Sequence, residues 1–282
     1  MTVQSCLLKV QGKIKGLTEA EKKVANYVLS NYMDILNDTV TEIAEKAGSS
    51  DATVVRFCKS VGYKGFQDFK INLAQDVMVP YQHLNPNLDK DDTVNEIVNK
   101  IVQSEITVLQ ETLTILDYKA LEKAADAIVK AKSINFFGSG GSSCISMDAM
   151  HKFLKIGIKS FSQSDMDIQS MRASLLNKND VALGISHSGC HKSVIDCLKL
   201  AKKCGATTIG LTTQGKSPIL KYCDIVLFTS TKETAFKSES ITARIAQLAI
   251  IDSLVAIVAF RSYEKSYDAI QKTRNATSNR KY

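Results

Sequence analysis

The pattern of apolar and polar positions at the start of the chain predicts a series of short helices. A threonine precedes a glutamate by three residues at Thr18–Glu21 and again at Thr39–Glu42, which is the capping-box spacing that begins a helix. Apolar residues then recur three and four positions apart, so each helix has one apolar face. A third helix is expected near Asp51, after a turn at 48–50. This region is therefore predicted to be all-helical.

Farther along the chain, short apolar and β-branched runs alternate with helical segments. Because helices separate the strands, the strands are expected to pair in parallel, with helices on both faces of the sheet. This pattern predicts an α/β domain with a five-stranded parallel sheet, a flavodoxin-like sandwich. The strands are expected at Ser133–Phe137, Lys159–Ser162, Asp180–Ile185, Thr207–Leu211 and Asp224–Phe228.

The two patterns meet in a segment typical of a linker. Pro80 and Pro86 fall among Asn and Asp residues there, and proline interrupts both helices and strands. We expect a helical domain at 1–77, a linker at 78–95 and an α/β domain with flanking helices at 96–282.

Composition favours a reduced, cytoplasmic protein. Seven cysteines include no CxxC pair, which is typical of free thiols. The N-terminus lacks the apolar core of a signal peptide. The apolar run Ile245–Phe260 is interrupted by Gln247 and Asp252 and is shorter than the ~20 residues that a spanning helix needs. We therefore expect a buried helix here and no membrane span.

The helical region has the spacing of a helix-turn-helix. Ala44 is small, as a close helix crossing requires, and Gly48 suits a sharp turn with positive φ. Val54 and Phe57 are expected to point into the core. Thr53, Arg56 and Ser60, with Lys59 alongside, are expected on the opposite, free face, where polar side chains can read the major groove.

DNA is therefore the expected partner of this region, the alternative being an ordinary helical hairpin. The net charge of +7 permits a nucleic-acid partner without requiring one. Acidic residues offset much of the local basic charge, so a homodimer or homotetramer is expected to supply useful affinity. The candidate DNA-binding residues are Ser50, Asp51, Thr53, Arg56, Lys59 and Lys64.

Two Gly/Ser-rich loops in the α/β region each join a strand to a helix. The first is Gly138–Ser143, ahead of a helix expected at Ile145–Leu154, and the second is Ser186–Gly189, ahead of a helix at Cys190–Lys203. Such loops direct backbone amides and hydroxyls at an anion. Neither has a Walker A or a complete dinucleotide motif, and one alone is as well explained as a structural turn. Together, at the carboxyl ends of parallel strands, they favour a phosphate site.

His187 and His191 invite a metal-site interpretation. His187 lies in a loop, and no further ligand cluster accompanies the pair. We expect no metal and no cofactor.

Both regions resemble one family. Residues 39–70, especially Ala52–Lys59 and Gly62–Lys70, are similar to the helix-turn-helix of RpiR-type bacterial regulators, and about 128–260 resembles their sugar isomerase (SIS) domain. The SIS resemblance rests on Phe137–Ser142, Ile185–Gly189 and Ala243–Leu248 with Ile251 and Asp252.

The resemblance implies that Ser186, His187 and Ser188 surround a sugar phosphate and that Ser139 and its loop complete the pocket. Two departures from the family pattern stand out: His191 replaces a usual threonine, and Ser49 replaces a usual apolar residue. The full set of effector-binding candidates is Ser139, Gly140, Ser142, Ser186, His187, Ser188, Gly189 and His191.

The expected function is transcription regulation controlled by a phosphorylated sugar or amino sugar. The SIS domains are expected to pair through long C-terminal helices, including 238–260. The alternative is an enzyme, a sugar-phosphate isomerase or amino-sugar-phosphate lyase, for which Glu239 and His151 are the only acid–base candidates. An oligomerising module without a ligand would leave the two loops unexplained. No enzyme activity is expected.

Overall fold

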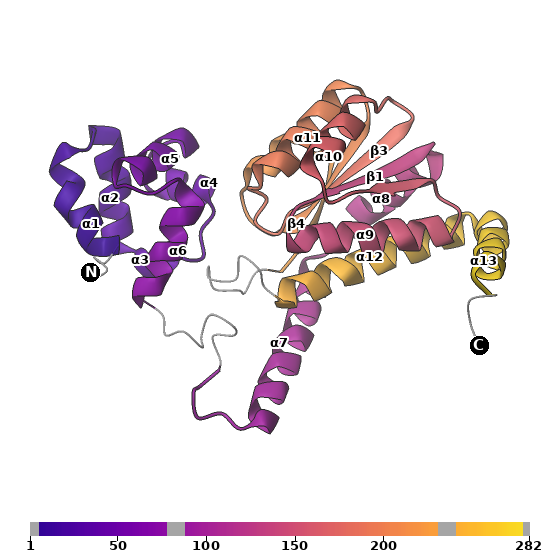
Figure 1. Ribbon diagram of the computed structural model, residues 1–282, viewed down its shortest axis with the longest axis horizontal. Coiled ribbons are helices and arrows are strands. Elements are labelled where there is room, and N and C mark those ends of the chain that lie inside the picture. Colours follow the sequence, from indigo (N-terminus) through magenta and orange to yellow (C-terminus); the bar gives the residue numbers. More distant parts are fainter. Residues whose placement is uncertain (1–5, 78–87, 231–240, 279–282) are drawn as a thin grey trace. The chain divides into compact units, whose positions relative to one another are not determined.

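The computed structural model describes residues 6–77, 88–230 and 241–278, and the chain separates into two compact units (Figure 1). The main division falls between Ile106 and Thr107, within helix α7 (Val94–Ile115). Most of the expected linker at 78–95 lies outside the described residues, so that boundary stays a prediction.

The first unit is helical, as predicted. Both capping boxes form, at Thr18 and Thr39, and Ser50 caps the third expected helix through its hydroxyl. The described elements are α1 (Cys6–Lys13), η1 (Ile14–Gly16), α2 (Glu19–Ser30), α3 (Tyr32–Ile35), α4 (Val40–Lys46), α5 (Asp51–Ser60) and α6 (Phe66–Val77).

Aromatic rings form the centre of this unit. The ring of Phe69 on α6 meets the rings of Phe57 and Tyr63 edge-on, at centroid distances of 5.5 and 5.4 Å. Val54 is buried beside Phe57 on α5, as the apolar spacing predicted. These contacts fix the orientation of α5, because edge-to-face pairs constrain ring geometry as well as burying area.

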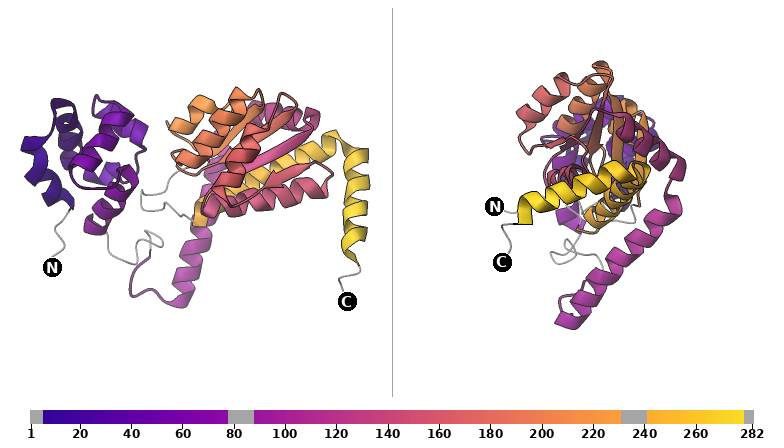
Figure 2. Two further views of the ribbon diagram at one scale, coloured as in Figure 1. Left: turned by 45° about the horizontal axis from the view of Figure 1, so that its top comes forward. Right: turned by 90° about the vertical axis from the view of Figure 1, so that its right-hand side faces the viewer.

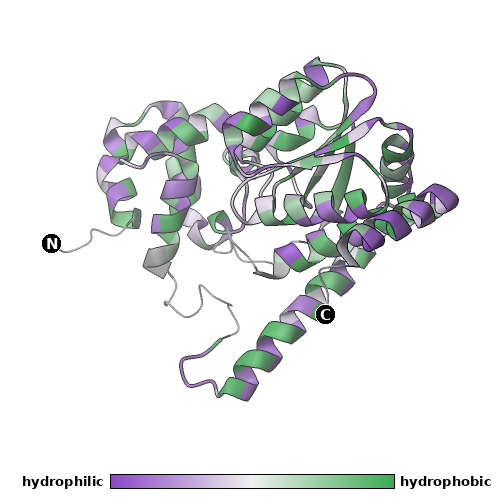
Figure 3. Cartoon of the chain, turned by 45° about the vertical axis from the view of Figure 1, so that its right-hand side comes forward, coloured by the Kyte–Doolittle hydropathy of each residue, from purple (hydrophilic) through white to green (hydrophobic). Residues whose placement is uncertain are grey.

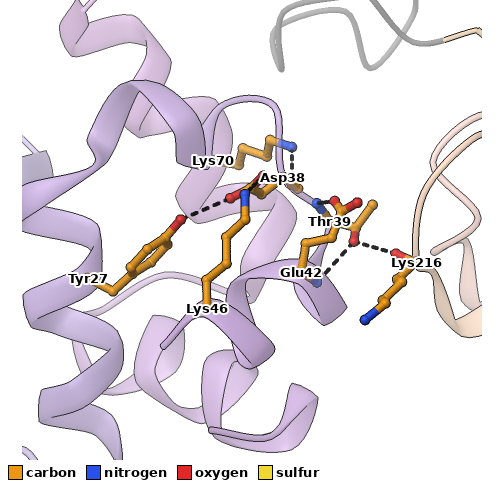
Figure 4. Close-up of polar contacts among 7 residues, drawn as sticks. All are labelled: Tyr27, Asp38, Thr39, Glu42, Lys46, Lys70 and Lys216. Atoms are coloured by element: carbon orange, nitrogen blue, oxygen red, sulfur yellow. Dashed lines mark hydrogen bonds and ion pairs between the residues drawn. The ribbon is translucent and has the colours of Figure 1, made fainter. Parts of the chain in front are cut away.

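A buried carboxylate joins three helices of the unit (Figure 4). Asp38 lies between α3 and α4 and accepts hydrogen bonds from the Tyr27 hydroxyl at 3.3 Å and from the Lys46 ammonium at 2.6 Å. Lys70 of α6 donates to the Asp38 backbone carbonyl at 2.7 Å. The hydrogen bond to Asp38 raises the pKa of Lys46, and burial followed by the Asp38 charge raises the pKa of Tyr27.

In the second unit, all five expected strands form, with ends shifted by one or two residues where they differ. The strands pair in parallel in the order β2-β1-β3-β4-β5, which is the flavodoxin-like order. They are β1 (Ser133–Gly138), β2 (Ser160–Ser162), β3 (Asp180–Ile185), β4 (Thr207–Thr213) and β5 (Ile225–Thr229).

Helices cover both faces of this sheet and divide the core into two layers (Figures 1 and 3). Successive side chains of a strand point to opposite faces of the sheet, so Phe136 packs against one helix layer and Phe137 against the other. One face is covered by α8 (Tyr118–Lys130), α9 (Gly141–Lys155) and α12 (Ile241–Arg261), and the other by α10 (Met166–Ser174), α11 (Lys192–Lys203) and η3 (Pro218–Tyr222).

Helix α12 is the expected apolar helix. Among the described residues, one segment, Ala243–Arg261, is long and apolar enough to cross a membrane by length and composition. Ile250, Leu254 and Val258 on α12 are buried in the core with α8 and α9, and a core helix passes the same test. We therefore interpret α12 as a core helix; α13 (Tyr263–Ser278) turns away from its end (Figure 2).

The Asp38 contacts predict an alkaline loss of stability. Because Lys46 and Tyr27 both have a raised pKa in the fold, their contribution is complete at lower pH and is lost as the pH rises above about 10. Asp38→Asn should lower the free energy of unfolding at pH 7 by about 1–2 kcal/mol and flatten this alkaline decline. Calorimetric unfolding between pH 7 and 11, with the exposed Asp196→Asn as control, measures both; an unchanged alkaline slope in Asp38→Asn would contradict the account.

Candidate functional site

The turn between α4 and α5 has the predicted geometry. Gly48 adopts φ +59°, a left-handed conformation that side chains disfavour. The amide of Ser49 donates to the Ala44 carbonyl at 2.7 Å, which closes the end of α4. Ala44 is buried where α4 meets α5, as its small size predicted.

On α5 the free face is narrower than predicted. Arg56 and Lys59 are exposed, but Thr53 is only 4 % exposed, so its prediction as a free-face residue was wrong. Thr53 lies in the first turn of α5, which Ser50 caps. The Thr53 amide donates to the Ser50 hydroxyl, and the Thr53 hydroxyl accepts from Arg56 Nη2 at 3.0 Å. Thr53 therefore orients Arg56 and does not itself face outward.

The remaining DNA-binding candidates differ in how far they are exposed to solvent. Ser50 and Lys64 are exposed, whereas Asp51 is half-buried and accepts a hydrogen bond from the Thr41 hydroxyl at 3.0 Å. Ser60, also expected on the free face, is exposed but donates to Glu21 of α2 at 2.8 Å. The exposed basic candidates are thus Arg56, Lys59 and Lys64.

Ser49 carries a buried hydroxyl for which the described residues provide no hydrogen-bond partner. A buried, unpaired hydroxyl costs free energy because its hydration is lost without replacement. An apolar residue, which the family resemblance has at this turn position, would avoid this cost.

Two neighbouring serines should therefore respond oppositely to alanine. Ser49→Ala should raise the free energy of unfolding by about 1 kcal/mol, since it removes an unpaired buried hydroxyl. Ser50→Ala should lower it by about 1 kcal/mol, since the α5 cap is lost. Denaturant titrations of the full chain measure both; a destabilising Ser49→Ala would show that the Ser49 hydroxyl is paired.

In the second unit, the first Gly/Ser-rich loop begins at the end of β1, where Gly138 lies very close to α9. A β-carbon on Gly138 would lie 2.5 Å from both the Ser142 carbonyl oxygen and the Ser146 hydroxyl, so glycine is required there. Gly140 has φ +55°, and α9 begins at Gly141, four residues before the predicted start at Ile145. The earlier start places Ser142 inside the first turn of α9, half-buried, with Ser139 in the loop just before it.

A residue that the sequence patterns did not single out fixes the start of this loop. The fully buried side-chain amide of Gln169, on α10, accepts a hydrogen bond from the Gly138 amide at 3.1 Å and donates to the Gly138 carbonyl at 2.9 Å. It also donates to the Gln163 carbonyl at 2.6 Å. No local sequence signal marks Gln169, because its burial and its partner become visible only in the fold.

The second loop follows β3 and is held by the end of β4. The His187 carbonyl accepts from the Thr212 hydroxyl and from the Thr213 amide, both at 3.1 Å. The Thr213 hydroxyl lies 2.9 Å from His187 Nδ1. Ser186 is buried and Ser188 is exposed. Contacts with the end of β4 therefore hold both the backbone and the imidazole ring of His187.

Gly189 and His191 complete this loop. Gly189 has φ +61°, and its carbonyl accepts from the Ile219 amide at 3.0 Å. His191 is exposed and occupies the cap position of α11, which begins at Lys192. The prediction that this helix begins at Cys190 was therefore early by two residues.

Sheet register brings the two loops together. Gly138, the last residue of β1, pairs with Ile185, the last residue of β3, in adjacent parallel strands. Both loops consequently leave the carboxyl edge of the sheet side by side, as expected. Hydroxyls and the N-termini of α9 and α11 collect there, an arrangement suited to an anion. Among the described residues, no group of three His, Cys, Asp or Glu side chains could hold a metal ion.

Comparison with known proteins agrees with both halves of this architecture. Residues 4–79 match the helix-turn-helix domain of the rpiR family, and residues 127–257 match the SIS domain. HexR of Escherichia coli, named an HTH-type transcriptional regulator, is 31% identical over 96% of this chain and 93% of its own. The chain belongs to the RpiR family of helix-turn-helix transcriptional regulators.

A further relative and a solved structure are similar over nearly the whole chain. An uncharacterized HTH-type transcriptional regulator of Caldanaerobacter subterraneus is 36% identical over 94% of both chains. The structure of the Vibrio vulnificus NanR protein complexed with ManNAc-6P superposes with a TM-score of 0.84 and 27% identity, covering 99% of this chain and 100% of that one. The predicted family and fold are confirmed.

Proposed function

We propose that this RpiR-family regulator binds operator DNA through α5 and that a phosphorylated sugar or amino sugar, bound at the two serine-rich loops, controls that binding. The observation that carries the proposal is the pairing of Gly138 with Ile185, which sets the two loops side by side at the carboxyl edge of the sheet. The similar NanR structure contains ManNAc-6P, which makes an amino-sugar phosphate a first choice for testing.

The DNA-binding half of the proposal is supported by the exposed face of α5. Arg56 and Lys59 are exposed there, and Thr53 fixes the guanidinium of Arg56 in place. An arginine held in one orientation can form a bidentate contact with guanine. Three exposed basic candidates per chain make few phosphate contacts, so a homodimer or homotetramer in the cytoplasm is part of the proposal.

A regulator is favoured over an enzyme. The curated relatives of nearly full length, such as HexR, are named transcriptional regulators. A phosphoheptose isomerase of Francisella tularensis, at 20% identity and a TM-score of 0.51, shares the fold alone. Of the two acid–base candidates, His151 is exposed on α9 and Glu239 lies outside the described residues. The proposal is therefore that the protein has no isomerase or lyase activity.

Arg56→Ala tests the DNA-reading role. Loss of a bidentate base contact should cost ~1–3 kcal/mol of operator affinity and relax sequence preference at one position. Binding of sugar phosphates should not change. Gel-shift titrations against operator variants measure this, with the exposed α2 substitution Lys23→Ala as a charge-matched control. Wild-type affinity and preference in Arg56→Ala would remove Arg56 from the reading role.

A thermal-shift screen against phosphorylated sugars, including ManNAc-6P, comes first for the effector half, because a bound ligand raises the unfolding temperature. Ser186→Ala/Ser188→Ala should then weaken binding of the selected sugar phosphate at least about tenfold, since hydrogen bonds to a charged partner are lost. Operator binding without effector should stay near wild type, while its response to the sugar phosphate disappears.

The matched control for this double variant is Ser170→Ala/Ser174→Ala, which removes two hydroxyls from the exposed side of α10. Because Ser186 is buried, the unfolding temperature of each variant is measured without ligand. A folded Ser186→Ala/Ser188→Ala protein that responds at the same effector concentration as wild type would place the effector elsewhere.

A further inference from the structure

The exposed basic residues predicted for DNA binding are few, namely Arg56, Lys59 and Lys64. Double-stranded DNA carries one negative charge for about every 1.7 Å of its axis, and each phosphate that a lysine or arginine neutralises adds to affinity. In protein–DNA complexes, about half or more of the hydrogen bonds go to phosphates and sugars rather than to bases. Further cations beside α5 would therefore strengthen the binding of a duplex.

Helix α1 places one such cation at the end of α5. Lys13 Nζ donates to the Ser60 carbonyl at 3.3 Å, and it would lie 3.5 Å from a β-carbon built on Gly62. Ser60 is the last residue of α5, one turn after Arg56 and about 6 Å farther along the helix axis. Residues four apart are neighbours on a helix surface, so Lys13 extends the exposed basic face of α5 beyond its end.

Three more lysines lie around the same helix end. Lys9, one turn earlier on α1, has its Nζ 5.2 Å from the centroid of the Tyr63 ring. The Tyr63 amide donates to the Cys58 carbonyl of α5 at 2.9 Å, so this ring lies at the end of α5. Lys59, in the last turn of α5, and Lys64, which follows Tyr63, are exposed. We call these residues the lysine cluster: Lys9, Lys13, Lys59 and Lys64.

The lysine cluster keeps a net positive charge. In the described part of this unit, Lys22 and Lys46 form ion pairs with carboxylates, whereas no lysine of the cluster does. Two carboxylates lie next to the cluster, Glu21 and Asp68, and both already accept hydrogen bonds from protein donors. Glu21 is buried and Asp68 is half-buried. Four cations therefore face two less exposed anions.

The contacts of Lys9 and Lys13 leave both ammonium groups able to bind a phosphate. An ammonium group has three donors, so one carbonyl or one ring does not exhaust them. A helix in the major groove has a phosphate backbone on each side, because the groove is only about 12 Å wide. Cations next to the end of such a helix are close enough to contact that backbone.

We propose that the lysine cluster binds the sugar-phosphate backbone of the DNA duplex whose bases α5 reads. This inference rests on the proposed function. It adds α1 to the DNA-binding surface and gives Lys9 and Lys13 a role that does not depend on base sequence.

The test measures binding of the full chain to two labelled duplexes by fluorescence anisotropy at several salt concentrations. One duplex has mixed sequence, and the other is selected by the wild-type protein from a random-sequence library. Lys9→Gln/Lys13→Gln should make the slope of log affinity against log salt shallower by about 1.8 for each bound chain, since two phosphate contacts are lost. Both duplexes should bind at least about tenfold more weakly in ~0.1 M salt, so the preference between them should stay the same.

Two control variants accompany this measurement. Lys119→Gln/Lys123→Gln removes the same charge at the same spacing from the exposed side of α8 and should bind both duplexes as wild type does. Lys9→Arg/Lys13→Arg keeps the charge and should keep the wild-type salt slope. Because Lys13 also contacts the end of α5, the unfolding temperature of each variant is measured without DNA. If the double glutamine variant is destabilised, Lys9→Gln alone carries the test, with an expected slope change of about 0.9.

The outcomes separate this inference from the proposed function. A wild-type salt slope in the folded glutamine variant would overturn the phosphate-binding role of α1 and leave base reading by Arg56 in place. Weakening confined to the selected duplex would also overturn it, because it would show base reading. Failure of the wild-type protein to bind either duplex would overturn the proposed function itself.

Discussion

The close approach of β1 to α9 at Gly138 is the constraint on which the candidate site depends. Because a β-carbon there would lie 2.5 Å from backbone and hydroxyl oxygens of α9, the chain can pass directly from strand to helix only with glycine at this position. Gln169 then fixes the Gly138 peptide from the other side with a buried pair of hydrogen bonds. The start of the first loop is therefore held by contacts on both sides, which is the support that a binding site needs from its scaffold.

Local patterns allowed much of the fold to be predicted from the sequence. Capping boxes at Thr18 and Thr39 mark real helix starts, and the alternation of strands and helices gave the parallel sheet. These signals depend on residues close together in the chain. The predicted free-face position of Thr53 failed because the Ser50 cap and Arg56 enclose its side chain, an effect of three-dimensional contacts that helical spacing alone does not describe.

The residue that holds the first loop, which the sequence did not reveal, comes from a distant segment. Gln169 reaches Gly138 across 31 positions. Its side chain has no local signature, since a glutamine in a helix is most often solvated. Packing of α10 against the sheet gives Gln169 its partner. The sequence allows an anion site to be proposed at the two loops, but it does not identify the residue that holds the first of them.

Control of DNA binding by a sugar phosphate requires that the effector bind one arrangement of the protein more tightly than another, and such coupling is reciprocal. The most direct test is the affinity of the full chain for the sugar phosphate selected by screening, measured with and without saturating operator duplex. The account predicts that operator changes this affinity by the same factor by which the sugar phosphate changes operator affinity, at least about fivefold. Equal effector affinity in the presence and absence of operator would contradict it.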